Sequence, residues 1–175
     1  MAILKFCYKI FHPGVPDDKI PKQFKMSIWK GIMKPVRKYF SAVIIPTIPF
    51  NGMRVCLYRL FGYNIGKGTF IGMRCYLDDV CYDKIEIGKN VTISYGVYFA
   101  CHGRKQRDHN KIIIKNGAYI GMRASIISPH DVVIGEGSIV GACALVNKNV
   151  PDYSIAVGVP CRILDKKVPA RKNRE

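Results

Sequence analysis

A repeat of six residues runs from Ile65 to Val159 and constrains the fold more than any other feature. Aliphatic residues, often followed by glycine, recur at steps of six, and a small or compact residue follows each of them by four positions. The aliphatic positions are Ile65, Ile71, Leu77, Ile87, Ile93, Ile114, Ile120, Ile134, Val140 and Val146. The compact positions are Thr69, Cys75, Cys81, Val91, Val97, Ala118, Ala124, Ser138, Ala144 and Val150. A repeat of fixed period predicts stacked structural units.

One large and one small inward side chain in every six residues suit one flat face of a narrow triangular prism. Three such faces make a coil of about eighteen residues, and successive coils stack at the ~4.8 Å spacing of paired strands. The repeat therefore predicts an all-β fold, a parallel β-helix, in preference to the alternating strands of a β-sandwich.

The register of the repeat predicts where the coils are interrupted. Runs of aliphatic positions begin at residues 65, 87, 114 and 134, so the steps between them are 22, 27 and 20 residues. These steps exceed an eighteen-residue coil by 4, 9 and 2 residues. We therefore expect complete coils, with loops inserted only where one coil passes to the next.

The chain carries a formal net charge of +16, and the excess is concentrated near its beginning. Residues 1–64 hold eleven Lys and Arg against Asp17 and Asp18 alone, a net charge of +9. Such an excess implies an anionic partner: a phosphorylated cofactor, an acidic lipid surface or nucleic acid. The basic residues lack the interleaved aromatics of a single-strand binding platform, so we expect no nucleic-acid partner.

The seven cysteines form neither a CxxC pair nor a Cys/His metal pattern, and several occupy compact inward positions of the repeat. An odd number of cysteines used as small apolar side chains indicates a reducing cytoplasm rather than a disulfide framework. No cleavable signal pattern is present. The most apolar run, residues 42–50, is shorter than the ~20 residues that a membrane-spanning helix needs. We expect a cytoplasmic protein.

Residues 1–62 are expected to form a basic N-terminal arm with amphipathic helices. Residues 1–21 contain three prolines and predict an extended segment. Residues 24–40 carry apolar side chains at helical spacing among lysines and arginines. Their apolar face could cap the open first coil, make peripheral contact with an anionic membrane surface, or do both. Residues 53–61 predict a further short helix, ended by Gly62.

The longest insertion, about residues 100–112, contains two of the four histidines and a cluster of cations. The sequence also contains the Ile-Gly hexapeptides and the ending Ala156-Val157-Gly158-Val159-Pro160-Cys161-Arg162. With these three features, the chain resembles the left-handed β-helix acyltransferases. The resemblance is greatest to the maltose/galactoside and capsule-type O-acetyltransferases and covers about residues 51–164. It implies a left-handed coil in residues 63–164, although crossover connections are otherwise nearly always right-handed. Residues 165–175 form a basic tail.

The resemblance implies an acetyl-CoA-dependent O-acetyltransferase that acts on a saccharide hydroxyl of a surface polysaccharide or its precursor. His102 matches the general base of such enzymes, because it directly follows the strand expected at residues 97–100. An imidazole with a pKa near 6.5 is largely neutral at pH 7 and can accept the hydroxyl proton. N-acetylation of a nucleotide-linked amino sugar is the alternative that the same base would serve.

The resemblance further implies a homotrimer with its sites in grooves between subunits. The basic arm would suit a lipid-linked acceptor at the inner face of the membrane. The residues that match positions contacting the donor are Met122, Ala142, Asn147, Lys148 and Arg162. Among them, Lys148 and Arg162 are suitable partners for the phosphates of acetyl-CoA.

The acceptor side is expected around Asp78 and Asp79, which begin the first insertion. Their carboxylates could hydrogen-bond sugar hydroxyl groups or orient the loop. His109 is either a second residue of the pocket or an ordinary loop histidine, and we expect structural roles for His12 and His130. The histidines do not reproduce the three-histidine zinc pattern of β-helix carbonic anhydrases, so we expect no metal.

Overall fold

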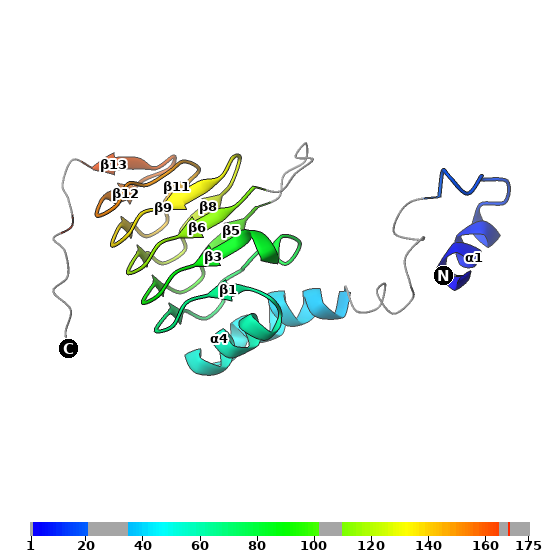
Figure 1. Ribbon diagram of the computed structural model, residues 1–175, viewed down its shortest axis with the longest axis horizontal. Coiled ribbons are helices and arrows are strands. Elements are labelled where there is room, and N and C mark those ends of the chain that lie inside the picture. The colour runs from blue at the N-terminus through cyan, green and yellow to red at the C-terminus, as the bar shows by residue number, and fades with distance from the viewer. Residues whose placement is uncertain (1, 21–34, 102–109, 165–167, 169–175) are drawn as a thin grey trace. The chain divides into compact units, whose positions relative to one another are not determined.

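The computed structural model describes residues 2–20, 35–101, 110–164 and 168 (Figure 1). The chain divides into two compact units, residues 1–40 and residues 41–175.

In the first unit, helix α1 (Ala2–Phe11) lies where we predicted an extended segment. That prediction was wrong because all three prolines follow residue 12, which leaves the first eleven residues free to form a helix. Of the predicted helix at residues 24–40, residues 21–34 lie outside the described residues, and residues 35–39 are helical.

The second unit is a parallel β-helix whose strands form three sheets. The first sheet contains β1 (Asn64–Ile65), β3 (Ile85–Ile87), β6 (Ile112–Ile114) and β9 (Val132–Ile134). The second contains β2 (Phe70–Ile71), β4 (Thr92–Ile93), β7 (Tyr119–Ile120), β10 (Ile139–Val140), β12 (Ile155–Val157) and β13 (Arg162–Leu164). The third contains β5 (Tyr98–Ala100), β8 (Ser125–Ile127) and β11 (Leu145–Val146). Every pair of neighbouring strands is parallel except β12 and β13, which are antiparallel.

The observed strand register confirms the arithmetic of the repeat. Ile65 is paired with Ile87, Ile87 with Ile114, and Ile114 with Ile134. The side chains at all the predicted inward positions, aliphatic and compact, are no more than 6 % exposed. They form one continuous core along the axis of the coils. No space remains inside the coils for a substrate, so any site must lie on their outer surface.

Glycine follows the aliphatic residue because successive coils approach each other closely at that corner. A Cβ atom on Gly66 would lie 2.5 Å from the backbone of Gly88 in the next coil. A Cβ atom on Gly121 would lie 2.5 Å from the backbone nitrogen of Ala142. Real side chains do not tolerate such contacts. Glycine is therefore required after the aliphatic residue wherever two coils stack this closely.

Helix α4 (Asn51–Leu60) covers the open end of the first coil, as Figure 1 shows. It is preceded by the short helices η2 (Phe40–Ile44) and α3 (Ile45–Thr47). Val55 and Tyr58 on its inner side are buried and join the core of the coils. The predicted helix at residues 53–61 is thus present, and it packs with the β-helix rather than with the arm, to which we had assigned residues up to 62.

Side chains of α4 also satisfy the backbone groups at the edge of the first coil. Asn51 accepts a hydrogen bond from Ile71 N–H (2.9 Å) and donates one to Thr69 C=O (3.3 Å), as a further strand would do. The buried guanidinium of Arg54 donates two hydrogen bonds to Ile71 C=O, at 3.0 and 2.6 Å, and one to Ile48 C=O. An exposed edge of this kind would otherwise be free to pair with another chain.

We predict that Arg54→Met destabilises the β-helix by about 2–3 kcal/mol, because buried carbonyl groups lose charged hydrogen-bond donors. Chemical denaturation of the purified chain measures the loss. Arg59→Met is the matched control, since Arg59 lies on the same helix and also donates to backbone carbonyls, those of Ile65 and Gly66, but is exposed. Its substitution should cost about 1 kcal/mol or less. Equal losses in the two variants would contradict a special role of Arg54.

Candidate active site

The three insertions lie along one edge of the prism, where the chain leaves the third sheet and enters the first (Figure 1). The first insertion runs from residue 78 to residue 84 and ends in the short 3-10 helix η3 (Tyr82–Lys84). The second joins β5 to β6, and the third joins β8 to β9. The insertions were predicted at the passage between coils, and the strand order confirms that position. Successive coils therefore bring them together at one edge.

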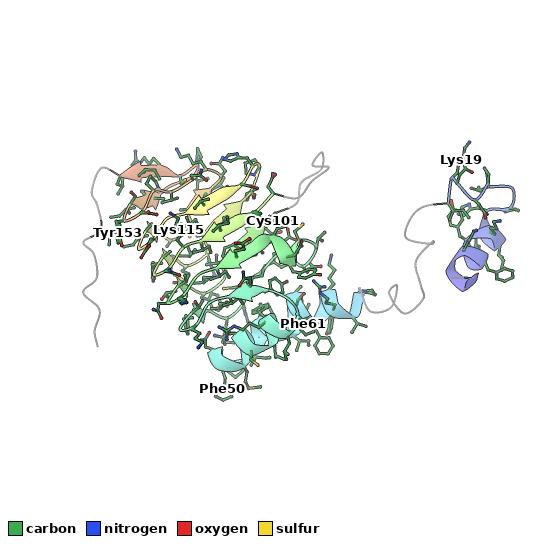
Figure 2. The ribbon with its side chains drawn as sticks, in the orientation of Figure 1. Lys19, Phe50, Phe61, Cys101, Lys115 and Tyr153 are labelled. Carbon is green, nitrogen blue, oxygen red and sulfur yellow. The ribbon has the colours of Figure 1, made fainter. Side chains whose placement is uncertain are left out.

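Asp78 is fully buried at this edge, and its carboxylate holds two insertions together. One oxygen accepts hydrogen bonds from Val80 N–H (3.0 Å) and Cys81 N–H (3.3 Å) within the first insertion. The other accepts a hydrogen bond from Cys101 N–H (2.8 Å), at the end of β5. Figure 2 labels Cys101 at the point where the second insertion begins. Of the two roles we considered for Asp78, this geometry supports orientation of the loop, because a buried carboxylate bonded to backbone does not contact a saccharide.

The far end of the second insertion is held by the third. Asn110 donates a hydrogen bond from its amide to Ser128 C=O (3.1 Å). Lys111 N–H donates to the carboxylate of Asp131 (2.8 Å). The single hydroxyl hydrogen of Ser128 is shared between Lys111 C=O (3.0 Å) and His130 C=O (2.6 Å). The two ends of the insertion are thus bonded to coils below and above it. His102 and His109 lie between these ends, at positions outside the described residues.

Asp79 differs from its neighbour because it is only partly buried. It accepts a hydrogen bond from the hydroxyl of Tyr76 (2.7 Å). Burial, and then the bond to Asp79, raises the pKa of the Tyr76 hydroxyl above its usual value. The ring of Tyr76 stacks on that of Tyr98 with centroids 4.7 Å apart and an interplanar angle of 15°. Asp79 therefore keeps the exposure that a contact with an acceptor requires.

Sequence analysis missed this pair of tyrosines, although a signal was present. Tyr76 and Tyr98 occupy the same position in successive coils and form a parallel β-bridge. Once the steps between coils are known, such equivalent aromatic residues can be recognised as neighbours. Tyr98 is 43 % exposed, so the stack forms part of the outer surface of the third sheet.

The cysteines at this edge are unsuited to nucleophilic catalysis. Burial raises the pKa of the Cys101 thiol to about 12, and the charge of Asp78 adds to the shift. Burial likewise raises the pKa of Cys81 to about 12, again with a smaller contribution from Asp78. Both thiols are therefore protonated at neutral pH, whereas a thiolate is the reactive form of cysteine. Acyl transfer through either cysteine is disfavoured.

The residues expected to contact the donor lie on both sides of the third sheet. Met122 and Ala142 occupy successive coils at the corner before it, where Cys143 N–H donates to Met122 C=O (2.8 Å). Asn147 and Lys148 follow β11 at the other corner, the one that carries the insertions. Met122 is 50 % exposed, and Ala142 and Lys148 are also exposed. The structure thus brings these four residues to the borders of one face.

Arg162 is set apart from those four residues. It lies on β13, which pairs antiparallel with β12 so that Arg162 faces Val157 in the second sheet. Its side chain is exposed. A ligand that touches both Arg162 and Lys148 must therefore extend across the last coils. Within the described residues, no three His, Cys, Asp or Glu side chains are placed to hold a metal ion.

Comparison with known proteins identifies relatives of one kind. The chain is 30 % identical over 155 residues to the putative acetyltransferase YvoF of Bacillus subtilis, an alignment that covers 84 % of this chain and 89 % of that protein. It is 36 % identical over 107 residues to the serine acetyltransferase of Bacillus subtilis, which covers 59 % of this chain and 48 % of that enzyme. The chain therefore spans about half the length of that second relative. No family model matches.

Solved structures of the same fold are also similar. The hexapeptide-repeat acetyltransferase VCA0836 of Vibrio cholerae superimposes with a TM-score of 0.65 at 24 % identity, over 82 % of this chain and 94 % of that one. A maltose O-acetyltransferase of Clostridium difficile gives a TM-score of 0.62 at 22 % identity, over 78 % and 86 % of the two chains. At these identities the likeness establishes the fold alone.

We predict that Asp78→Asn destabilises the chain by about 1–3 kcal/mol and loosens the start of the second insertion. The asparagine amide cannot accept backbone hydrogen bonds at both of its ends, so at least one N–H group loses its acceptor. Hydrogen exchange at the Cys101 amide should accelerate. In the control, Asp79→Asn, the amide oxygen can still accept from Tyr76, so exchange at Cys101 should stay at the wild-type rate. Unchanged exchange in Asp78→Asn would contradict the role of this carboxylate.

Proposed function

The chain belongs to the hexapeptide-repeat acetyltransferases, and on that premise we propose that it transfers an acetyl group from acetyl-CoA to a hydroxyl group of a saccharide. We place the acceptor in a surface polysaccharide or its precursor, with His102 as the general base. The maltose O-acetyltransferase of the same fold gives a saccharide precedent for the acceptor. The Vibrio cholerae protein has been solved in complex with acetyl-CoA, which gives a precedent for the donor.

The observation that carries this proposal is the attachment of the second insertion at both ends. Asp78 holds its beginning at Cys101, one residue before His102, and Ser128 and Asp131 hold its end. Catalysis requires a base held within hydrogen-bond reach of the proton that it removes. A loop fixed on a rigid scaffold meets that requirement better than a free one.

In the proposed reaction, the neutral imidazole of His102 accepts the proton of the acceptor hydroxyl. The hydroxyl oxygen then forms a bond to the thioester carbonyl carbon, and nearby N–H groups stabilise the oxyanion that develops. The carbon–sulfur bond breaks, and the imidazolium returns its proton to the departing thiol. The raised pKa values of Cys81 and Cys101 support this direct transfer over an acyl-cysteine route.

For the donor, we propose a groove along the third sheet, bordered by Met122 and Ala142 on one side and Asn147 and Lys148 on the other. Arg162 and Lys148 would contact the phosphates, for which exposed cations are suited. His109 and Asp79 remain candidates for the acceptor side.

We further propose a left-handed coil, a homotrimer whose grooves lie between subunits, and a cytoplasmic location. Light scattering of the purified protein tests the trimer.

Two alternatives to a neutral saccharide acceptor are open. One is serine, because the relatives include a serine acetyltransferase as well as a solved maltose O-acetyltransferase. The other is an amine. Transfer to an amine, such as that of a nucleotide-linked amino sugar, would use the same base. A screen of neutral sugars, amino sugars and serine with acetyl-CoA, followed as release of free thiol, separates these possibilities. Turnover with neutral sugars supports the proposal, and turnover with amino sugars or serine alone contradicts it.

We predict that His102→Ala lowers kcat by about 10²–10⁴-fold, the usual contribution of a general base. Binding of acetyl-CoA, measured as thermal stabilisation, should be retained because no cofactor contact is removed. His130→Ala is the matched control: His130 is exposed in the third insertion, and only its carbonyl has an observed hydrogen bond, from Ser128. This variant should turn over at nearly the wild-type rate. Wild-type turnover of His102→Ala would exclude His102 as the base.

A further inference from the structure

The outer side of α4 carries a stripe of exposed apolar residues. Phe50, Met53 and Leu60 are 67 %, 53 % and 76 % exposed, and Cys56, between them, is also exposed. Their spacing of three or four residues places them on one side of the helix. We call these four residues the cap stripe. Figure 2 labels Phe50, whose side chain projects away from the coils at the end of the molecule that α4 covers.

The cap stripe has no role in the packing of the β-helix. Arg54, Val55 and Tyr58, on the opposite side of α4, are buried and make the contacts with the first coil. Val43 in η2, which precedes α3 and α4, is a further exposed apolar side chain (45 %) in the helices before the first coil. Contiguous apolar surface of this kind usually marks an interaction site.

The part of the sequence that contains the cap stripe carries cations and no acidic residue. Between Asp18 and Asp78 the sequence contains eleven Lys and Arg and no Asp or Glu. Within the second unit, exposed cations lie on α4 itself (Arg59), in the turn after β1 (Lys67) and in the turn after β2 (Arg74). Arg74 is bonded to the helices before the first coil, because its backbone N–H donates to the C=O of Pro46 in α3 (2.8 Å). The first carboxylate after them, that of Asp78, is buried.

We propose that the cap stripe docks on an anionic lipid bilayer, with its apolar side chains in the interface and the surrounding cations against the lipid headgroups. Apolar residues next to cations without acidic residues are the composition of surface-bound helices. If the cap stripes of two copies of the chain were in contact, by contrast, cations of one copy would face cations of the other, which is unfavourable. No helix in the described part of the chain is long and apolar enough to cross a bilayer, so contact is with the surface.

Docking through α4 brings the first coils close to the membrane. Along the coil axis, the diameter of α4 and one or two coil spacings, roughly 15–20 Å, separate the cap stripe from the level of Cys101, where the second insertion begins. An acceptor attached to a membrane lipid would then lie near the coil from which the second insertion starts. This surface does not depend on the identity of the acceptor, and its test requires no acetyl transfer.

The chain offers a matched pair of probes for the test. Cys56 lies on the cap stripe, and Cys143 is also exposed but lies in a late coil, between β10 and β11. The full-length chain is labelled with the polarity-sensitive fluorophore NBD at Cys56 in a Cys7→Ala/Cys143→Ala background, or at Cys143 in a Cys7→Ala/Cys56→Ala background. Each sample is titrated with vesicles of phosphatidylcholine alone, or of phosphatidylcholine with about 30 mol % phosphatidylglycerol. The phosphatidylglycerol supplies the negative headgroup charge.

We expect the Cys56 label to shift to shorter wavelength and brighten with anionic vesicles, and to respond little to neutral ones. The Cys143 label should respond to neither. A silent Cys56 label on protein that sediments with the vesicles would overturn the proposal, because the basic N-terminal arm would then carry the binding. Failure to sediment with anionic vesicles, or an equal response to neutral ones, would overturn it as well.

A substitution on the cap stripe provides the second measurement. Phe50→Ser/Leu60→Ser should weaken sedimentation with anionic vesicles by about tenfold or more, because two inserted apolar side chains are lost. Val159→Ser removes an equally exposed apolar side chain (70 %) beyond the last complete coil and should leave sedimentation unchanged. Unchanged sedimentation of the double variant would exclude the cap stripe as the docking surface. A lower particle mass of the double variant without vesicles would instead assign the stripe to a contact between copies.

Discussion

Backbone hydrogen bonds between successive coils are the constraint on which the rest of the structure depends. Gly66 N–H donates to Ile87 C=O, Gly88 N–H to Ile114 C=O, and the ladder continues upward in the same register. Each coil can therefore bury its inward side chains only if its neighbours keep the same phase. Extra residues are tolerated solely at an edge where they can leave the stack, and here that edge lies between the third sheet and the first.

A stack of coils has two open ends, and the chain closes them differently. At the beginning, α4 supplies polar side chains in place of a strand, so that Asn51 and Arg54 bond to the backbone of β2. At the other end, the chain reverses and β13 pairs antiparallel with β12. Covering the first end with a helix creates an outer helical surface, and the apolar residues on that surface are not needed by the fold.

The two neighbouring carboxylates of the first insertion show how the fold separates functions. Asp78 points into the edge and accepts backbone N–H groups from two insertions, whereas Asp79 points outward and accepts from Tyr76. One anion therefore holds Cys101, the residue before the loop that contains His102, and the other stays partly accessible. The pattern Asp-Asp could not distinguish them, because the difference depends on where Cys101 lies in the next coil.

The repeat by itself determined the parallel β-helix, its strand register and its inward side chains, because a period of six with alternating large and small residues fits one stacking only. It also located the insertions, and thereby His102. The segment expected to be extended at residues 1–21 instead begins with α1, because its prolines all follow residue 12. The boundary expected at residue 62 lies too late, because the apolar pattern of α4 indicates a helix but does not show that this helix packs on the first coil. Only the tertiary structure decided which carboxylate is buried, which residues border the same face, and which side of α4 faces away from the core. Those properties arise from contacts between residues far apart in the sequence, and a local pattern does not encode them.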